Sequence, residues 1–372
     1  MTHRFPIKEI ARQSGLSTAT VDRAINKRAH VSPQTKTRVA AAICELEGQE
    51  AQLAARGRRL FFDFVIEAPE RFSREVRQAT EHVLPRIGGA VCRPRFLMQE
   101  IMTEQDVLQA LMRISKRGSH GVCLKVRDVP AIRAAVDNLV ASGIPVVTLV
   151  TDLSETRRIA YVGLDNQSAG RTAAYLISKT IGDVCGTVLT SRSNDRFLGE
   201  EEREAAFVAT LNRLCPRIRI CDLSGGSGVH FETSRVMHDA MEGLEHLSAV
   251  YSMGGGNPAI LSVLEQHGLL PDIYVAHDLD KDNRRLLDAG QLDFVLHHDL
   301  RIDLENVFQA LLRYHKLISG DLSAPMSNVQ IVTPENVPAS HRRPINPSQA
   351  RRQNSVVPAE RNVKGPKGSL QQ

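Results

Sequence analysis

The sequence predicts an all-α domain with a helix-turn-helix, followed by a two-lobed α/β domain made of doubly wound parallel sheets. Two short helical patterns, broken at a glycine, occupy residues 7–26. From residue 59 onward, buried-strand patterns alternate with amphipathic helical patterns, as in chains of βαβ units. Because this alternation runs through two successive units, we expect two lobes with a cleft outside the carboxyl ends of their strands.

The N-terminal pattern contains a signal for each of three helices. Ile7 and Ile10 recur at helical spacing, and Gly15 supplies the tight turn after them because glycine adopts positive φ at little cost. Ser17 is a suitable N-cap for a second helix, and Ser32 caps a third helix that begins with proline. A helix, a glycine turn and a second helix form the unit whose second helix reads the major groove of DNA. The apolar faces of the second and third helices are predicted to contain Val21, Ala24, Ile25, Val39, Ala42, Ile43 and Leu46.

The chain from residue 60 to residue 338 reads as strands separated by helices. This order indicates parallel strands joined by helical crossovers. The predicted strands occupy residues 60–66, 93–98, 121–126, 144–150, 186–190, 218–223, 249–253 and 272–278. The predicted helices occupy residues 75–87, 104–116, 129–142, 169–181, 200–214, 231–242 and 258–268.

Charge is distributed unevenly along the chain, whose formal net charge is +5. Residues 1–59 contain eleven Lys and Arg against five Asp and Glu, and residues 339–372 contain seven against one. The part between these two segments therefore carries a net negative charge. A basic head on an acidic body indicates a nucleic-acid partner at one end. Residues 339–372, rich in Pro, Ser, Asn, Gln and Arg, are predicted to be a disordered basic tail.

Several classes of function find no support in the sequence. The six cysteines are scattered without a C-x-x-C pair, which predicts small reduced core residues and neither a disulfide framework nor a zinc site. The polar N-terminus and the absence of a long apolar run predict a cytoplasmic, nucleoid-associated protein without a membrane partner. Two glycine clusters, at 225–228 and 254–256, lack the lysine of a phosphate loop and are predicted to be loops at strand ends. No pattern points to a metal or a cofactor, and no G-x-S-x-G or H-E-x-x-H motif supports an enzyme.

The segments IKEIARQSGLSTATVDRAIN and VSPQTKTRVAAAICEL resemble the headpiece of the LacI/GalR family of bacterial transcription regulators. AYVGLDNQSAGRTAAYLI (160–177), GEEEREAAF (199–207) and VAHDLDKDNRRLL (275–287) resemble the effector domain of that family, which is similar to periplasmic sugar-binding proteins. The resemblance implies a DNA-binding headpiece at 1–46, a hinge or linker at 47–59 and an effector-binding and dimerisation domain at 60–338. Its first lobe is expected at about 60–164 and 298–326, and its second at about 165–297 and 327–338.

The same resemblance places the operator-reading positions at Thr18 and Ala19, which open the predicted recognition helix. These side chains favour apolar contact with thymine methyl groups. Arg23, one turn later, is the candidate for guanine O6 and N7, and its alternative is a solvated helix face. Asp22 is unusual beside phosphate and is expected either to restrain Arg23 or to lie away from DNA. Phosphate contacts or caps are expected from Ser17, Thr20 and Asn26.

Residues 47–59 correspond to the hinge helix of the family, which folds on DNA and inserts a leucine into the minor groove. Here Gly57 occupies the position at which that leucine is usual, and Gly48 and Glu50 replace the usual aromatic residue and proline. Either Leu53 takes over the wedge, or this protein kinks its operator less.

Strand ends in the two lobes supply the candidate effector ligands. Arg203 and Asp278 match the family motif most closely. An arginine and carboxylates that converge from both lobes can form bidentate hydrogen bonds to vicinal hydroxyl groups. Each polar candidate could instead cap a helix or form a surface salt bridge, and Phe197 could instead belong to a lobe core. The other candidates are Phe72, Asp152, Asn257 and His298, with Phe197 as a further aromatic residue.

The resemblance implies a regulator that binds a pseudo-palindromic operator as a homodimer, with a sugar or polyol controlling operator affinity. Repression relieved by the ligand is the commoner arrangement. Two other functions remain open. A purine or phosphosugar corepressor would raise operator affinity instead of lowering it. A DNA-tethered sugar-modifying enzyme would turn over its sugar and would lose that activity, but not DNA binding, when Asp278 is changed to asparagine.

Overall fold

Three helices form the N-terminal domain: α1 (Ile7–Ser14), α2 (Thr18–Ile25) and α3 (Pro33–Ala55). Both predicted caps are present, since Ser17 Oγ accepts the Thr20 backbone N–H at 3.2 Å and Ser32 Oγ accepts that of Thr35 at 3.1 Å. Gly15 ends α1 at a φ of 63°. Helix α3 continues to Ala55, so the predicted linker at 47–59 begins inside this helix. The helices enclose a core of Phe5, Ile10, Ala11, Val21, Val39, Ala42 and Leu46.

The computed structural model describes residues 4–26, 28, 31–55, 58–182, 185–226, 230–241 and 244–338. The predicted basic tail at 339–372 lies outside these residues, as do Gly57 and, in the GGSG cluster, Ser227 and Gly228. The side chain of Leu53 is also not described.

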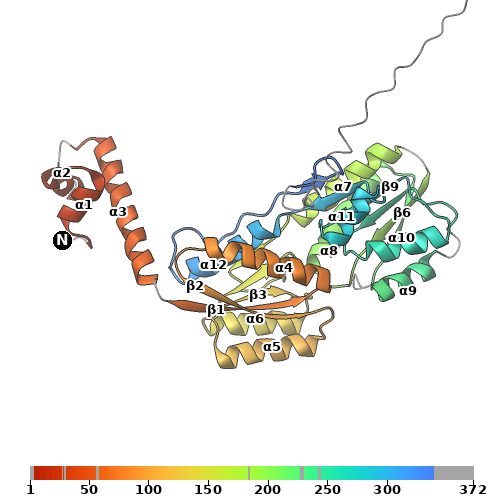
Figure 1. Cartoon of the computed structure of the whole chain (residues 1–372), viewed down its shortest axis with the longest axis horizontal. Coiled ribbons are helices and arrows are strands. Elements are labelled where there is room, and N and C mark those ends of the chain that lie inside the picture. The colour runs from red at the N-terminus through yellow and green to blue at the C-terminus, as the bar shows by residue number, and fades with distance from the viewer. Residues whose placement is uncertain are drawn as a thin grey trace, which may run out of the picture. The chain divides into compact units, whose positions relative to one another are not determined.

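The first sheet of the body has five parallel strands in the order β2-β1-β3-β4-β5. Helices α4 (Glu70–Val83) and α12 (Leu300–Tyr314) cover one face, where Phe62 and Phe64 pack on Phe308. Helices α5 (Glu104–Arg117) and α6 (Pro130–Ala141) cover the opposite face (Figure 1). The strands are β1 (Arg59–Glu67), β2 (Val91–Gln99), β3 (Gly121–Lys125), β4 (Val146–Leu149) and β5 (Ala160–Val162).

The second sheet has six strands in the order β11-β10-β9-β8-β6-β7, with only β11 antiparallel to its neighbour. Helices α7 (Asn166–Ile181) and α8 (Leu198–Leu214) cover one face, where Phe207 stacks on Tyr251. Helix α10 (Asn257–Gln266) packs against α9 (His230–Ala240) and α11 (Lys281–Asp288). The strands are β6 (Gly186–Ser191), β7 (Ile218–Leu223), β8 (Ala249–Ser252), β9 (Ile273–His277), β10 (Phe294–His297) and β11 (Gln330–Val332).

The chain passes from one sheet to the other after β5, after β10 and before β11. Residues that follow strands of the first sheet contact residues that follow strands of the second. The Asp128 N–H donates to the Arg196 carbonyl at 2.7 Å, and the Gly199 N–H donates to Thr151 Oγ1 at 3.1 Å. The carboxyl ends of the two sets of parallel strands therefore meet, which is where a ligand is expected in sheets of this kind.

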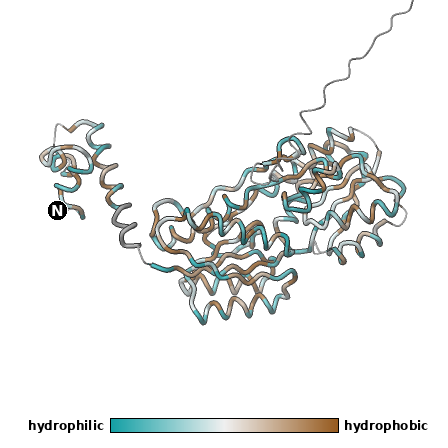
Figure 2. The backbone as a smooth tube through the Cα atoms, in the orientation of Figure 1, coloured by the Kyte–Doolittle hydropathy of each residue, from teal (hydrophilic) through white to brown (hydrophobic). Residues whose placement is uncertain are grey.

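Hydrophobic residues follow the strands of both sheets (Figure 2). Among the described helices, none is both long and apolar enough to cross a membrane. The buried cysteines, Cys92, Cys123 and Cys215, fit the predicted core role. That prediction is wrong for Cys44 on α3 and Cys185 before β6, which are exposed, and Cys221 on β7 is only partly buried.

The prediction for the first helix of the body was wrong at both ends, because α4 begins at Glu70 and ends at Val83. Pro69 precedes the helix, and Phe72 and Val76 already belong to its buried face. The charged residues of the first turn hide this apolar spacing in the sequence. Leu84–Arg86 forms a separate 3-10 turn around a proline, which ends the α-helix earlier than the pattern predicts.

Candidate functional site

The predicted recognition helix α2 presents its first turn to solvent. Thr18 and Ala19 are exposed, as is Arg23 one turn later. Ser17 and Thr20 hydrogen-bond each other through their hydroxyl groups at 2.8 Å, which fixes the start of the helix. The side chains expected to reach base edges therefore lie on an open helical surface, as insertion into a major groove requires.

Asp22 pairs with two neighbouring side chains of the headpiece. Its carboxylate accepts a hydrogen bond from Asn26 Nδ2 at 2.8 Å and forms an ion pair with Arg28 at 3.3 Å. Within the described headpiece, the Arg23 side chain has no hydrogen bond or ion pair, so Asp22 does not restrain it. The amide of Asn26 is occupied at the end of α2, whereas Arg23 is available for another partner.

In the body, Arg203 of α8 contacts both α7 and the residue that follows β8. It is only 2% exposed, and its guanidinium donates from Nε to Asn166 Oδ1 at 2.7 Å and from Nη1 to the Met253 carbonyl at 3.3 Å. Gly170 of α7 makes this placement possible, because a Cβ there would lie 2.1 Å from the Arg203 carbonyl oxygen. The close contact of α7 and α8 thus fixes the arginine that the sequence singled out.

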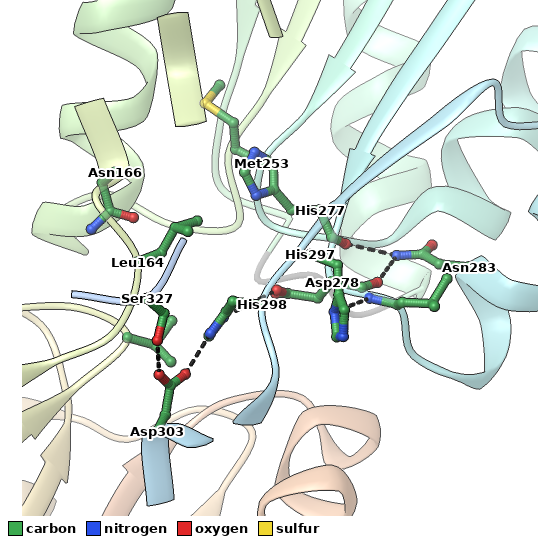
Figure 3. Close-up of polar contacts among 12 residues, drawn as sticks. Leu164, Asn166, Met253, His277, Asp278, Asn283, His297, His298, Asp303 and Ser327 are labelled. Atoms are coloured by element: carbon green, nitrogen blue, oxygen red, sulfur yellow. Dashed lines mark hydrogen bonds and ion pairs between the residues drawn. The ribbon is translucent and has the colours of Figure 1, made fainter. Parts of the chain in front are cut away.

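Asp278 and His298, both predicted, lie beside each other at the ends of β9 and β10 (Figure 3). His298 Nε2 is 3.5 Å from Asp278 Oδ1, and its Nδ1 is 2.5 Å from Asp303 Oδ2. Ser327 Oγ donates to the other oxygen of Asp303. The backbone of Asp278 has a φ of 63° and its carbonyl accepts Asn283 Nδ2 at 2.7 Å, so the residue is held at both its main chain and its side chain.

The two carboxylates determine the charge of the histidine. Burial by itself would lower the pKa of His298, but Asp303 and Asp278 outweigh burial and raise the pKa to about 10. Burial would raise the pKa of Asp278, but the hydrogen bond and charge of His298 outweigh it and hold that pKa well below its usual range. The pair is therefore a carboxylate beside an imidazolium at neutral pH. Asp278 keeps 33% of its side chain exposed and can still accept hydrogen bonds from a ligand.

Two phenylalanines from different lobes meet around a lysine that sequence reasoning missed. Lys125 Nζ lies 4.2 Å from the centre of the Phe197 ring and 5.4 Å from that of Phe72, and it donates to the Glu67 carbonyl at 3.2 Å. Its position at the end of a predicted strand is the signal that could have found it. We refer to Phe72, Lys125, Phe197, Arg203, Asp278 and His298 as the interlobe site.

Arg71 was also missed, and it explains one of the glycine clusters. Arg71 Nε pairs with Asp280 at 2.8 Å, and its Nη2 donates to the Gly254 carbonyl at 3.4 Å. A Cβ on Gly255 would lie 1.8 Å from Arg71 Nη2, and the residue has a φ of 85°. The glycines at 254–256 are therefore a loop at a strand end, as predicted, and they also make room for an arginine from the other lobe.

Asn257 and Asp152 do not join the interlobe site. Asn257 is fully buried, donates to Asn283 Oδ1 at 2.6 Å and accepts the Tyr274 hydroxyl at 2.9 Å. Both carboxylate oxygens of Asp152 accept hydrogen bonds from Arg158. In the described part of the chain, no group of three or more His, Cys, Asp or Glu side chains could hold a metal ion.

Glu204 of α8 and Asp222 of β7 are neighbouring carboxylates whose protonation gives a prediction for pH dependence. Burial raises the pKa of Glu204, and the neighbouring Asp222 raises it further, to about 7. Arg192 Nε lies 2.8 Å from Glu204, and its Nη2 lies 2.9 Å from Asp222. Because the unfolded carboxyl titrates near 4.5, only the folded protein keeps this proton between pH 4.5 and 7. Stability should therefore fall as pH rises through that range.

Glu204→Gln should remove this pH dependence, because glutamine stays neutral at every pH. At pH 8 we expect the variant to gain about 1–2 kcal/mol in free energy of unfolding, a figure reduced for partial solvent screening, and to gain little at pH 5. Urea denaturation at both pH values measures the effect. Glu232→Gln, which removes an exposed carboxylate paired with Arg235, is the control and should change nothing. An equal gain at both pH values would contradict the assignment.

The exposed helix α2 is typical of a DNA-binding protein, and the two-lobed α/β body brings polar groups to one interlobe site. Together these features define a DNA-binding regulator with a ligand-binding body. Residues 6–47 match the family model of bacterial regulatory proteins of the lacI family, and residues 102–312 match that of the periplasmic binding protein domain. The chain belongs to the LacI family of regulators, with a body that belongs to the periplasmic binding protein domain family.

Solved structures with a similar fold cover about three quarters of the chain. A putative LacI transcriptional regulator from Bacteroides fragilis is 15% identical, with a TM-score of 0.64 over 75% of this chain and 98% of that one. A solute-binding protein from Burkholderia graminis, solved with D-arabinose, is 18% identical, with a TM-score of 0.67 over 76% and 97%. The glucose-galactose binding protein GanP from Geobacillus stearothermophilus is 15% identical, with a TM-score of 0.67 over 76% and 99%. No protein of curated function matches the sequence significantly.

Proposed function

We propose that this protein is a homodimeric transcriptional repressor whose operator affinity falls when a sugar or polyol binds at the interlobe site. The observation that carries the proposal is that Phe72 and Phe197 of different lobes flank Lys125, and that Arg203 and Asp278 both act electrostatically on the same lysine. The arginine and the carboxylate offer a donor and an acceptor to hydroxyl groups, and the aromatic rings offer apolar faces to a sugar ring. A protein of similar fold solved with D-arabinose and a glucose-galactose binding protein of similar fold support this ligand class.

The DNA-binding part of the proposal uses the exposed surface of α2. A homodimer places two such helices on half-sites about 34–36 Å apart, one turn of DNA. Thr18 and Ala19 would read base edges, with Ser17, Thr20 and Asn26 at the borders of the surface and Leu53 as the candidate wedge. Sedimentation of the full chain, with and without operator, tests whether it is a dimer.

Operator binding and ligand coupling can be tested in one experiment. An operator selected from random duplexes is titrated with the full chain at fixed salt, with and without each of a panel of sugars, polyols, sugar phosphates and purines. We expect one compound to weaken operator binding by about 5–150-fold, the usual range of allosteric coupling. Ligand-enhanced binding by a purine or phosphosugar would establish the corepressor function instead. Turnover of a sugar would establish an enzyme, and failure to select any operator would overturn DNA-binding regulation.

Arg23→Ala should weaken binding to the selected operator by about 10–100-fold, because one bidentate arginine–guanine contact contributes about 1–3 kcal/mol. The loss should be confined to operators that carry guanine at one position of each half-site. Fluorescence anisotropy at constant ionic strength measures it. The control is Arg74→Ala, which removes an exposed arginine from α4 of the body and should leave operator affinity unchanged. A uniform loss across all DNA sequences would reassign Arg23 to a phosphate contact.

A further inference from the structure

The interlobe site contains two cations that have no carboxylate partner. Lys125 Nζ has one hydrogen bond, to the Glu67 carbonyl, and otherwise faces the rings of Phe72 and Phe197. Arg203 is 2% exposed, and its guanidinium donates only to an amide oxygen and a backbone carbonyl. Neither residue forms an ion pair with any carboxylate in the described ranges.

Most other partly buried arginines of the body pair with a carboxylate, whereas Arg313 donates to Gln309 Oε1 at 3.0 Å instead. Arg71 pairs with Asp280 at 2.8 Å, and Arg127 pairs with Glu67 at 3.1 Å. A buried charge is costly unless an opposite charge or several hydrogen bonds offset it. A lysine and an arginine without carboxylate partners in one site could therefore be neutralised by an anionic group of a ligand.

Three carboxylates act on Lys125 through space, and each of them also has another partner in the protein. Glu67 is held by Arg127, and both oxygens of Glu200 accept hydrogen bonds from Ser193, at 2.7 Å from its backbone and at 2.6 Å from its hydroxyl. Asp278 is held by His298 at 3.5 Å. These three carboxylates still act on Lys125 through space, and they partly offset the lowering of its pKa that burial and Arg203 cause. They make a second negative charge on a ligand costly.

From this arrangement we infer that the effector is an acidic sugar, an aldonate or uronate, whose carboxylate pairs with Lys125 and Arg203. Its hydroxyl groups then donate to Asp278, and its ring or carbon chain lies against Phe72 and Phe197. A single negative charge fits better than a phosphate dianion because Glu200 and Asp278 already act on Lys125 with their negative charges. This inference rests on the proposed function, since it names the ligand class of the same interlobe site.

Matched pairs of compounds test the inference on the full chain by isothermal titration calorimetry. The pairs are D-galactose with D-galacturonate and D-glucose with D-glucuronate, with D-gluconate and D-glucose 6-phosphate added. At least one acid should bind about tenfold or more tightly than its neutral counterpart, as expected for hydrogen bonds to a charged group. Lys125→Gln should abolish that preference, and Lys125→Arg should retain it.

The control Lys179→Gln changes an exposed lysine on α7 and should leave both affinities unchanged. Neutral sugars that bind as tightly as their acids, in wild type and Lys125→Gln alike, would overturn the acidic-sugar inference and leave a sugar-responsive regulator intact. Binding confined to the phosphorylated sugar would also overturn it, in favour of a phosphate ligand. Absence of binding by every compound would overturn both the inference and the proposed sugar or polyol effector.

Discussion

Asp303→Asn is expected to lower the free energy of unfolding by about 3 kcal/mol at pH 7, because it removes one partner of a buried ion pair. Asp303 is fully buried and accepts hydrogen bonds from His298 and Ser327. These residues follow β10, begin α12 and precede β11, which are the segments that join the two sheets. The substitution therefore weakens the connection between the lobes as well as the charge balance of His298.

The pH dependence of this loss separates the ion pair from a simple packing defect. The pKa of His298 is raised to about 10 in the folded protein, against about 6.5 for an ordinary histidine. Its contribution to stability is therefore fully present below pH 6.5 and is lost as pH rises from 6.5 to 10. The wild type should lose stability over this range, and Asp303→Asn should lose much less. The range is distinct from that of Glu204, which ends near pH 7.

Urea denaturation at several pH values between 6 and 10 measures both effects. Asp288→Asn is the control, because it removes a half-exposed carboxylate that pairs with Arg284 within one helix and should cost less than about 1 kcal/mol. A wild type and an Asp303→Asn variant with parallel pH profiles would show that His298 is not held protonated by these carboxylates.

Much of the fold follows from local signals in the sequence. Ser17 and Ser32 set the starts of α2 and α3 through hydrogen bonds to backbone groups three residues later, which a sequence displays directly. Arg203 and Asp278 were predicted from a motif, and the structure brings both to the interlobe site. The start of α4 was missed because its first turn is dominated by charged residues, so burial by a distant sheet is the only signal.

The expectation that ligands bind at the carboxyl ends of strands located candidate binding residues, but it could not predict where their side chains point. Asn257 follows β8 as predicted, yet Asn283 and Tyr274 engage its amide inside the second lobe. Lys125 also ends a strand, but its environment includes Phe197 from the other lobe, which lies 72 residues further along the chain. The role of Lys125 depends on contacts between the two lobes. Such contacts join residues far apart in the sequence, so only the structure reveals them.

Gly170 has a role in tertiary packing that local helix propensity does not reveal. Gly170 lies inside α7, where glycine is normally less favourable than alanine by about 0.5–1 kcal/mol. Its value comes from tertiary contact, since α8 approaches so closely that a Cβ would lie 2.1 Å from the Arg203 carbonyl oxygen and 3.0 Å from the Phe207 backbone nitrogen.

Gly170→Ala is therefore expected to lower the free energy of unfolding, although helix propensity predicts that it would raise it. Propensity alone would stabilise the protein, whereas the clash with the backbone of α8 should destabilise it by about 1–3 kcal/mol. Because α8 carries Arg203, its displacement should also weaken effector binding at the interlobe site by about tenfold or more. Urea denaturation and calorimetry with whichever sugar binds the wild type measure the two effects.

Gly88→Ala is the matched control, because nothing lies within 4 Å of the Cβ it would add and its φ is not in the left-handed region. It should change the free energy of unfolding by less than about 0.5 kcal/mol and leave ligand affinity unchanged. A stabilised Gly170→Ala variant would mean that α7 and α8 can separate at little cost. In that case the position of Arg203 would have to be fixed by Asn166 and Met253 alone, and effector binding should survive the substitution.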